Sequence, residues 1–157
     1  MDTNTVSRAF PLFISLTNCR VVVVGGGRIA SRRIRTLCEF GANIIIISPH
    51  VLEETKKLID AGCAEWIERE YRSGDCAGAR IVVTATNCRE VNKQVGQECL
   101  ELSIPVSVAD SKEESTYYFP GVACDDSVVV GVTASGTNHS LARRITDEIK
   151  RLLKGGV

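Results

Sequence analysis

The chain has 157 residues, which is enough for one compact domain with a substantial core and too short for two domains of ordinary size. Acidic and basic side chains balance at 19 each, which excludes a strong overall field that would draw the protein to nucleic acid or to an anionic membrane. Aromatic residues are few, whereas β-branched residues are abundant, and this composition is typical of buried parallel strands.

The start of the chain and its cysteines both indicate a reducing compartment. The start lacks the features of a signal peptide, and the apolar segment Phe10 to Leu16 is too short to span a bilayer, so we expect a soluble, cytoplasmic protein. The seven cysteines are odd in number and form no C-x-x-C pair. We therefore expect buried, small hydrophobic side chains, with a regulatory or metal-holding thiol as the alternative. The cysteines stand at positions 19, 38, 63, 76, 88, 99 and 124.

Strands alternate with helices along the first two thirds of the chain. Short apolar runs such as Arg20 to Val24 fit strands buried on both faces, and the helices between them repeat apolar residues every three or four positions. This alternation predicts an α/β fold with a doubly wound, Rossmann-like parallel sheet, whose ligands bind at the carboxyl ends of the strands. The expected elements are strands over 20–24, 43–47, 65–68, 81–85 and 105–108, and helices over 28–40, 51–61 and 91–102, the first two closed by glycines at 41 and 62.

The last third of the chain has a different pattern. A polar loop over 111–116 is followed by two apolar runs, 119–123 and 127–133, which predict a hairpin, and by a helix that begins near Ser140. This tail is too small to be an independent domain. We expect it to extend the parallel sheet or to pair with a second subunit.

Three glycines separate the first strand from the first helix. Gly25 permits the tight turn, Gly27 lets the backbone approach a pyrophosphate, and a small Ala30 completes the G-x-G-x-x-A motif by letting the helix pack on the strand. Backbone N–H groups at the start of the helix then face the anion. The motif lies between a strand and a helix, so we predict dinucleotide binding, with a purely structural turn as the alternative.

The second strand ends without the acidic residue that usually holds the adenosine ribose. The turn Ser48-Pro49-His50 stands there, and no carboxylate follows until Glu53. Ser48 can bond a ribose hydroxyl, and Arg28 can meet a 2′-phosphate. The residues alone therefore leave NAD and NADP both open.

Polar residues follow the next two strong strands as well. Thr84, Thr86 and Asn87 lie where a nicotinamide or ribose can sit, and we predict cofactor contacts there; a helix cap formed by Asn87 is the alternative. Asp110 follows the last strand of the sheet, where a carboxylate can act as a general base. The alternative is that Asp110 only starts the turn into Ser111.

Read in order, these segments resemble the precorrin-2 dehydrogenase family, which also forms the amino-terminal module of siroheme synthase. The resemblance covers nearly the whole chain. The matching segments are FPLFISL before RVVVVGGGRIASRR, GANIIIISP, ATN with VN shortly after, IPVSVAD followed by YFPG, and SGTNHSLARRI.

The resemblance implies NAD-dependent dehydrogenation of precorrin-2 to sirohydrochlorin in siroheme biosynthesis, with ferrochelatase activity, a lyase reaction, left open. It implies NAD as cofactor, a tetrapyrrole as substrate, and a homodimer without nucleic-acid or membrane partners. Residues 1–112 would form the NAD-binding domain, and 113–157 the extension for dimerisation and the substrate cleft. The family's V-x-D aspartate falls on Asp110, and its cofactor contacts fall on the glycine turn with Arg28 and Ile29 and on the turn at 48–50.

Two features depart from the family. Asn138-His139-Ser140 stands where a serine-proline pair is common, and further helices usually follow the point where this sequence stops, so we expect a shortened extension. We interpret His139 as a surface or capping residue. Arg143 and Arg144 either meet substrate carboxylates or face solvent. An NAD-sensing regulatory domain and a non-catalytic dimerisation module are the alternatives; both would bind NAD without oxidising precorrin-2.

Overall fold

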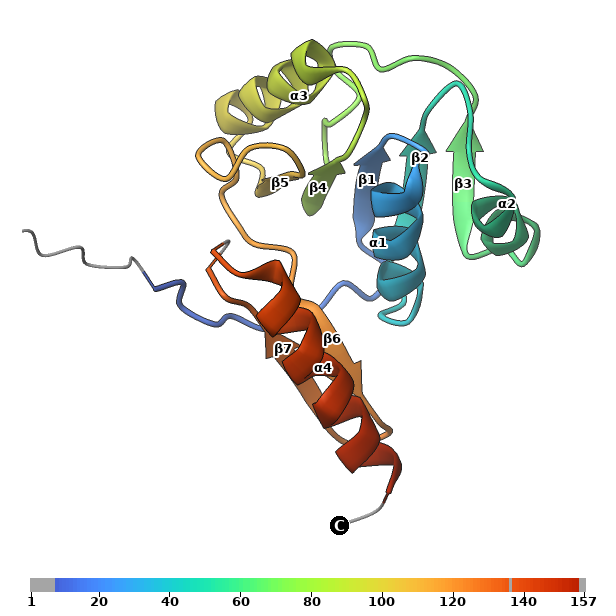
Figure 1. Ribbon diagram of the computed structural model, residues 1–157. Coiled ribbons are helices and arrows are strands. Elements are labelled where there is room, and N and C mark those ends of the chain that lie inside the picture. Colours follow the sequence, from blue (N-terminus) through green and yellow to red (C-terminus); the bar gives the residue numbers. More distant parts are fainter. Residues whose placement is uncertain (1–7, 136, 156–157) are drawn as a thin grey trace, which may run out of the picture. The chain divides into compact units, whose positions relative to one another are not determined.

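The computed structural model describes residues 8–135 and 137–155, which form two compact units (Figure 1). One unit spans Ile14–Tyr117, and the other joins the described residues of Met1–Phe13 to those of Tyr118–Val157. The first seven residues, on which the expectation about a signal peptide depends, lie outside the described part. Among the helices described, none has the length and apolarity needed to cross a membrane.

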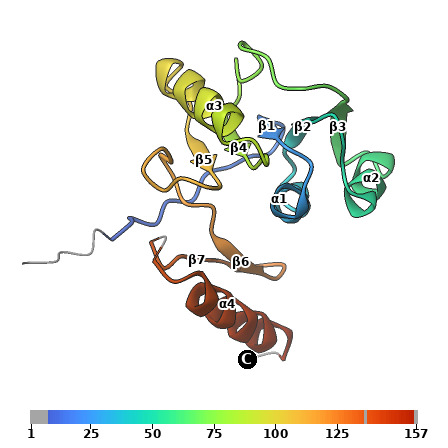
Figure 2. The same ribbon diagram turned by 45° about the horizontal axis from the view of Figure 1, so that its top comes forward.

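The unit Ile14–Tyr117 is a five-stranded parallel sheet, which confirms the expected α/β fold. Its elements are β1 (Arg20–Val24), α1 (Arg28–Cys38), β2 (Asn43–Ile47), α2 (Glu53–Asp60), β3 (Ala64–Ile67), β4 (Ile81–Thr84), α3 (Arg89–Glu101) and β5 (Val106–Val108). The strand order is β3-β2-β1-β4-β5, and every neighbouring pair is parallel. Figure 2 shows α1 and α2 on one face of this sheet and α3 on the other.

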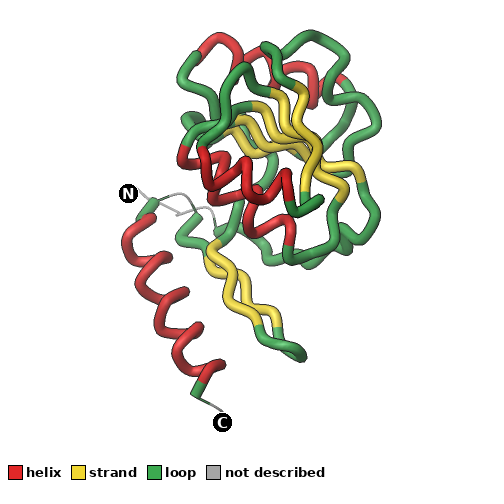
Figure 3. Tube along the Cα trace, turned by 90° about the vertical axis from the view of Figure 1, so that its right-hand side faces the viewer, coloured by secondary structure: helices red, strands yellow, loops and turns green. Residues whose placement is uncertain are grey.

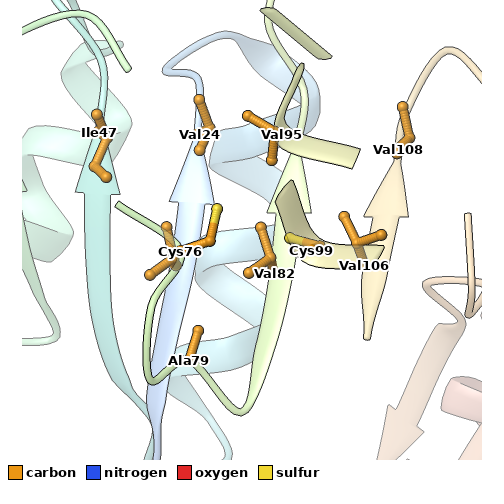
Figure 4. Packing of buried hydrophobic residues seen from close by; sticks show 10 residues of the cluster. Val24, Ile47, Cys76, Ala79, Val82, Val95, Cys99, Val106 and Val108 are labelled. Carbon is orange, nitrogen blue, oxygen red and sulfur yellow. The ribbon is translucent and has the colours of Figure 1, made fainter. Parts of the chain in front are cut away.

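Both faces of the sheet are buried because helices cover them. On the face of α3, Val22 and Val24 of β1 pack in one cluster with Val95 and Cys99 of α3 (Figure 4). On the other face, Ile34 of α1 is fully buried. Each such side chain contributes roughly 1.5–3 kcal/mol when it leaves water, so this core holds the strand ends, and the loops that follow them, in fixed register.

The helix ends differ from the sequence patterns by one or two residues: α1 ends two residues earlier, α2 is shorter at both ends, and α3 begins two residues earlier and ends one residue earlier. Gly41 and Gly62 adopt φ of +66° and +76°, which confirms the expected left-handed residues after α1 and α2. The second helix begins at Glu53 rather than Val51. Leu52 remains extended there, and its N–H donates to the carbonyl of Gly26 at 3.3 Å, which ties this turn to the glycines after β1.

The second unit consists of a hairpin and a helix. Strands β6 (Gly121–Cys124) and β7 (Val129–Val132) pair antiparallel, and α4 (His139–Lys154) runs alongside them (Figure 3). The helix approaches closely because Gly121 has no side chain: a β-carbon there would lie 2.3 Å from Thr146 Oγ1. The expected hairpin is thus confirmed.

The hairpin does not extend the parallel sheet, so the first of the two alternatives expected for the tail was wrong, and pairing with a second subunit stays a prediction. Strands β6 and β7 form a sheet of their own. The outer edge of β5 is already occupied by the following loop, because Val106 N–H donates to Thr116 Oγ1 at 2.8 Å and Val108 N–H donates to Ser115 Oγ at 2.9 Å. These hydroxyls take the positions that a sixth strand would need.

The seven cysteines, all among the described residues, form no disulfide, and only Cys76 and Cys99 are fully buried. Cys88 and Cys124 are exposed, so the expectation of uniformly buried cysteines was wrong for these two. Cys88 immediately precedes α3, and Cys124 is the last residue of β6. No group of three metal-ligating side chains gathers within the described residues.

Candidate functional site

The segments that follow β2, β1, β4 and β5 lie side by side along one edge of the sheet, which we call the carboxyl edge. Each is joined to its neighbour by a backbone hydrogen bond between the residue after one strand and the last residue of the next strand. These bonds are Gly25 N–H to Ile47 O at 2.9 Å, Ala85 N–H to Val24 O at 2.8 Å, and Ala109 N–H to Thr84 O at 2.9 Å. The predicted cofactor and catalytic residues belong to these segments or to the first turn of α1, except Thr84, which is the last residue of β4.

The three glycines at 25–27, which we call the glycine loop, differ in what surrounds them. Gly25 has φ of +119°, and a β-carbon there would lie 2.4 Å from the carbonyl oxygen of Ala85. A β-carbon on Gly26 would lie 1.9 Å from the carbonyl oxygen of His50. Gly27 has open space around it. Any residue is allowed at the middle position of the G-x-G-x-x-A motif, so the sequence analysis did not predict that position 26 requires glycine. The run of three glycines was the feature of the sequence that could have indicated it.

The start of α1 offers backbone N–H groups to an anion. Gly27 is the N-cap and supplies no side-chain cap, and no acidic residue lies in the first turn. Ser31 N–H makes the first helical bond, to Gly27 O at 2.9 Å, so the N–H groups before it have no helical acceptor. Arg28 is exposed and Ile29 is 46% exposed beside them. Open space at Gly27 next to unused donors fits a dinucleotide diphosphate.

The turn at 48–50 presents no carboxylate to a ribose. Ser48 is buried, and its hydroxyl donates to the carbonyl of His50 at 2.7 Å. Pro49 and His50 are exposed. The Ser48 hydroxyl therefore stabilises the turn, and only its lone pairs remain for a ligand.

A buried serine and a glutamate near this turn were not singled out from the sequence. Ser31 of α1 donates to Glu54 of α2 at 2.8 Å, and Arg35 pairs with the same carboxylate at 3.2 Å. The hydrogen bond from Ser31 holds the pKa of Glu54 below its ordinary value. This carboxylate already has partners in the structure, and it links α1 to α2.

Asn92 of α3 is the centre of the contacts at the end of β4. It is fully buried, and its Oδ1 accepts from Thr84 Oγ1 at 2.8 Å and from Thr86 N–H at 3.0 Å. Asn87 is exposed, and the N-cap of α3 is Cys88, so the alternative of a helix cap at Asn87 was wrong. Thr84 is itself fully buried, which leaves Thr86 and Asn87 as the polar residues of this segment that reach the surface.

Asp110 lies two strands away from the glycine loop on the same edge. Its Oδ2 accepts from Asn92 Nδ2 at 3.0 Å, and its Oδ1 lies 3.5 Å from a guanidinium nitrogen of Arg89. Arg89 also pairs with Glu114, and this bond raises the pKa of Arg89 above its ordinary value. The Asp110 side chain is 38% exposed, and both of its oxygens contact residues of α3. A residue that only starts a turn would not need these contacts.

The residues singled out in the tail lie in the second unit. Asn138 caps α4 by accepting from Leu141 N–H at 2.9 Å. His139 is the first helical residue and is exposed, as are Arg143 and Arg144. The interpretation of His139 as a surface residue is confirmed.

A parallel sheet of this strand order, with a glycine turn leading into an uncapped helix, defines a nucleotide-binding domain of the doubly wound class. A sequence model for the family described as "Putative NAD(P)-binding" matches residues 12–121. The chain belongs to this family, and a nicotinamide dinucleotide is therefore its cofactor, as expected.

Several named proteins are similar to this chain over most of its length. The chain is 38% identical over 153 residues to the "Probable multifunctional siroheme biosynthesis protein HemA" of Ruminiclostridium josui and 33% identical over 147 residues to the "Siroheme synthase" of Psychrobacter sp. (strain PRwf-1). These alignments cover 97% and 94% of the chain but 30% of each relative, so the chain spans less than a third of their length. The solved structure of "SirC, precorrin-2 dehydrogenase" superposes with a TM-score of 0.74 at 25% identity, over 92% of this chain and 71% of that one.

Proposed function

We propose that this protein catalyses the NAD-dependent dehydrogenation of precorrin-2 to sirohydrochlorin, with Asp110 as the general base. The observation that carries the proposal is the Asp110 carboxylate on the same carboxyl edge as the glycine loop, with only β4 between their strands. Two inter-strand spacings amount to roughly 10 Å. A dinucleotide whose diphosphate lies on the loop can span this distance along the edge.

The chemistry requires removal of two hydrogens from the macrocycle, one with its electron pair and one as a proton. NAD, when bound, accepts the first as a hydride. The backbone N–H groups of α1 bind the diphosphate, and the segment around Thr86 and Asn87 orients the nicotinamide end. Asp110 takes the proton that leaves a pyrrole nitrogen or ring carbon. A positioned base of this kind contributes on the order of 10²–10⁴-fold to the rate.

The relatives support this substrate class. Two of them are named for siroheme biosynthesis, and the superposed structure is named a precorrin-2 dehydrogenase. Seven cysteines without a disulfide are typical of a protein that works in the reducing cytoplasm, and we infer that location. We also infer a homodimer built through the second unit, because α4 leaves Leu141, Ile145 and Leu152 exposed, the last at 69%.

An anaerobic assay tests the proposal. Precorrin-2 is added with NAD or with NADP, and the absorbance of the reduced nicotinamide is followed. We expect Asp110→Asn to lower kcat by about 10²–10⁴-fold while the protein still binds NAD. A variant that turns over at the wild-type rate would remove Asp110 from the mechanism.

The same assay separates the proposal from the NAD-sensing and non-catalytic alternatives. Wild-type protein that binds NAD but leaves precorrin-2 unoxidised would support one of those alternatives. Ferrous ion added to the product tests for chelation as a separate activity.

A further inference from the structure

We propose that Asn92 is the positioning residue that aims the Asp110 carboxylate and joins it to the cofactor segment at 84–87. This inference rests on the proposed dehydrogenase function. Asn92 lies on α3, 18 residues before Asp110, and meets it only because α3 packs over β4 and β5. Its side chain is fully buried, so Asn92 contacts Asp110 from the interior of the protein and not from the solvent-exposed surface.

The hydrogen bonds of Asn92 leave its amide one possible orientation. Oδ1 must be the acceptor because Thr86 N–H and Thr84 Oγ1 both donate toward it, at 3.0 and 2.8 Å. Nδ2 then faces the other way and donates to Thr86 O at 3.1 Å and to Asp110 Oδ2 at 3.0 Å. If the amide were flipped, Nδ2 would face Thr86 N–H, so that two donors would meet. Oδ1 would then face the Asp110 carboxylate, so that two acceptors would meet. The backbone N–H of Thr86, just after β4, therefore fixes the direction in which Asp110 is held.

Arg89 completes the support from the surface. Its guanidinium lies 3.5 Å from Asp110 Oδ1 and also pairs with Glu114, while Asn92 holds Oδ2 from inside. The two carboxylate oxygens are thus held by different residues of the same helix. Arg89 is about half exposed, so water can replace its contact, whereas Asn92, the donor of the other bond, is fully buried. Asn92 is the residue that sets the orientation.

A double-mutant cycle on kcat tests this role. We expect Asn92→Ala to lower kcat on the order of tenfold to a hundredfold, the usual effect of losing a buried hydrogen bond to a charged group. In the Asp110→Asn background, the same change should lower kcat by a several-fold smaller factor, because the carboxylate that Asn92 aims is absent and only its contacts to Thr84 and Thr86 remain to be lost. Equal losses in both backgrounds would overturn the proposal.

Two controls separate positioning from general damage. Val95→Ala removes a fully buried side chain one turn further along α3 and should lower the melting temperature without lowering kcat. A loss of kcat in Val95→Ala equal to that in Asn92→Ala would also overturn the proposal. If Asn92→Ala does not fold, Asn92→Ser takes its place in the cycle, since a hydroxyl can still accept from Thr86 N–H.

A second readout needs no turnover. The ¹⁵N signal of the Asn92 side-chain amide, assigned by its loss in Asn92→Ala, should shift in Asp110→Asn, because the acceptor of its hydrogen bond changes from a carboxylate to an amide. An amide signal unaffected by the Asp110 substitution would overturn the inference. If the amide responds but wild-type protein does not oxidise precorrin-2, the proposed function fails while the link between Asn92 and Asp110 stands.

Discussion

Gly26 and Gly27 are adjacent residues with opposite surroundings. A β-carbon at position 26 would collide with the backbone of His50, whereas a β-carbon at 27 would project into open space at the start of α1. The backbone at Gly27, with φ of −80°, is also accessible to any residue. Gly26 therefore lets the glycine loop pack against the 48–50 turn, and Gly27 leaves room for a ligand.

Alanine at each of the two positions should separate these roles. We expect Gly26→Ala to lower the free energy of unfolding by about 1–3 kcal/mol, the usual cost of overpacking, because the 48–50 turn must move. Gly27→Ala should cost at most about 1 kcal/mol as a poorer N-cap, yet weaken NAD binding at least tenfold, since the methyl group occupies the space proposed for the diphosphate. Thermal unfolding and calorimetric titration with NAD measure both. Unchanged NAD affinity in Gly27→Ala would argue against the proposed diphosphate site.

Helix α3 does more than cover one face of the sheet. Besides Asn92 and Arg89, it carries Glu98, which is 9% exposed and accepts from Gly74 N–H and Cys76 N–H, each at 2.9 Å, and from the Tyr71 hydroxyl. Burial alone would raise the pKa of Glu98, but these hydrogen bonds outweigh it and hold the pKa below the ordinary value. The carboxylate thereby ties the loop before β4 to the helix.

This arrangement predicts a dependence of stability on pH. A carboxyl group whose pKa is lower in the folded than in the unfolded chain contributes stability above its unfolded value, near 4.3, and that stability is lost as the pH falls through the folded value. Glu98→Gln should therefore be less stable than wild type by about 1–3 kcal/mol at pH 7, and the difference should shrink below about pH 4. Melting temperatures across this range measure it.

Glu101→Gln, an exposed change on the same helix, is the matched control. It should leave stability nearly unchanged at pH 7. A gap between Glu98→Gln and wild type that stays constant down to pH 3 would show that the charge of Glu98 is not responsible.

At the scale of the whole molecule, the chain divides into two compact units, for which we propose separate tasks. The sheet unit contains every candidate cofactor residue and its own core, and its β5 edge is closed by Ser115 and Thr116. The second unit offers a hairpin and a helix with exposed apolar side chains. We assign cofactor binding to the first unit and self-association to the second.

A fragment of residues 14–117 should therefore fold, bind NAD with an affinity within about threefold of the full chain, and run as a monomer. The full chain should run as a dimer, because only it retains α4 and the hairpin. Light scattering gives the two masses, and calorimetry gives the affinities. A dimeric fragment, or a monomeric full chain, would contradict the assignment of self-association to the second unit.

The amino-acid sequence by itself determined most of the strands and helices and the edge of the sheet at which we propose that the cofactor binds. The runs that became β1 and β2 were predicted to the residue, and the glycines after β1, α1 and α2 marked the turns, because these signals depend on neighbours along the chain. The position of Asp110 at the end of β5 followed from the same local logic.

Only the tertiary structure decided which polar side chains meet. Asn92 and Asp110 are 18 residues apart, Ser31 and Glu54 are 23 apart, and Tyr71 and Glu98 are 27 apart, and nothing in their local sequence pairs them. The tertiary structure also decided that the hairpin stays outside the parallel sheet. The hydroxyls that occupy the outer edge of β5 come from a loop in which the sequence shows only polar residues. Such contacts arise from the packing of helices on the sheet, which brings distant residues into hydrogen-bonding distance.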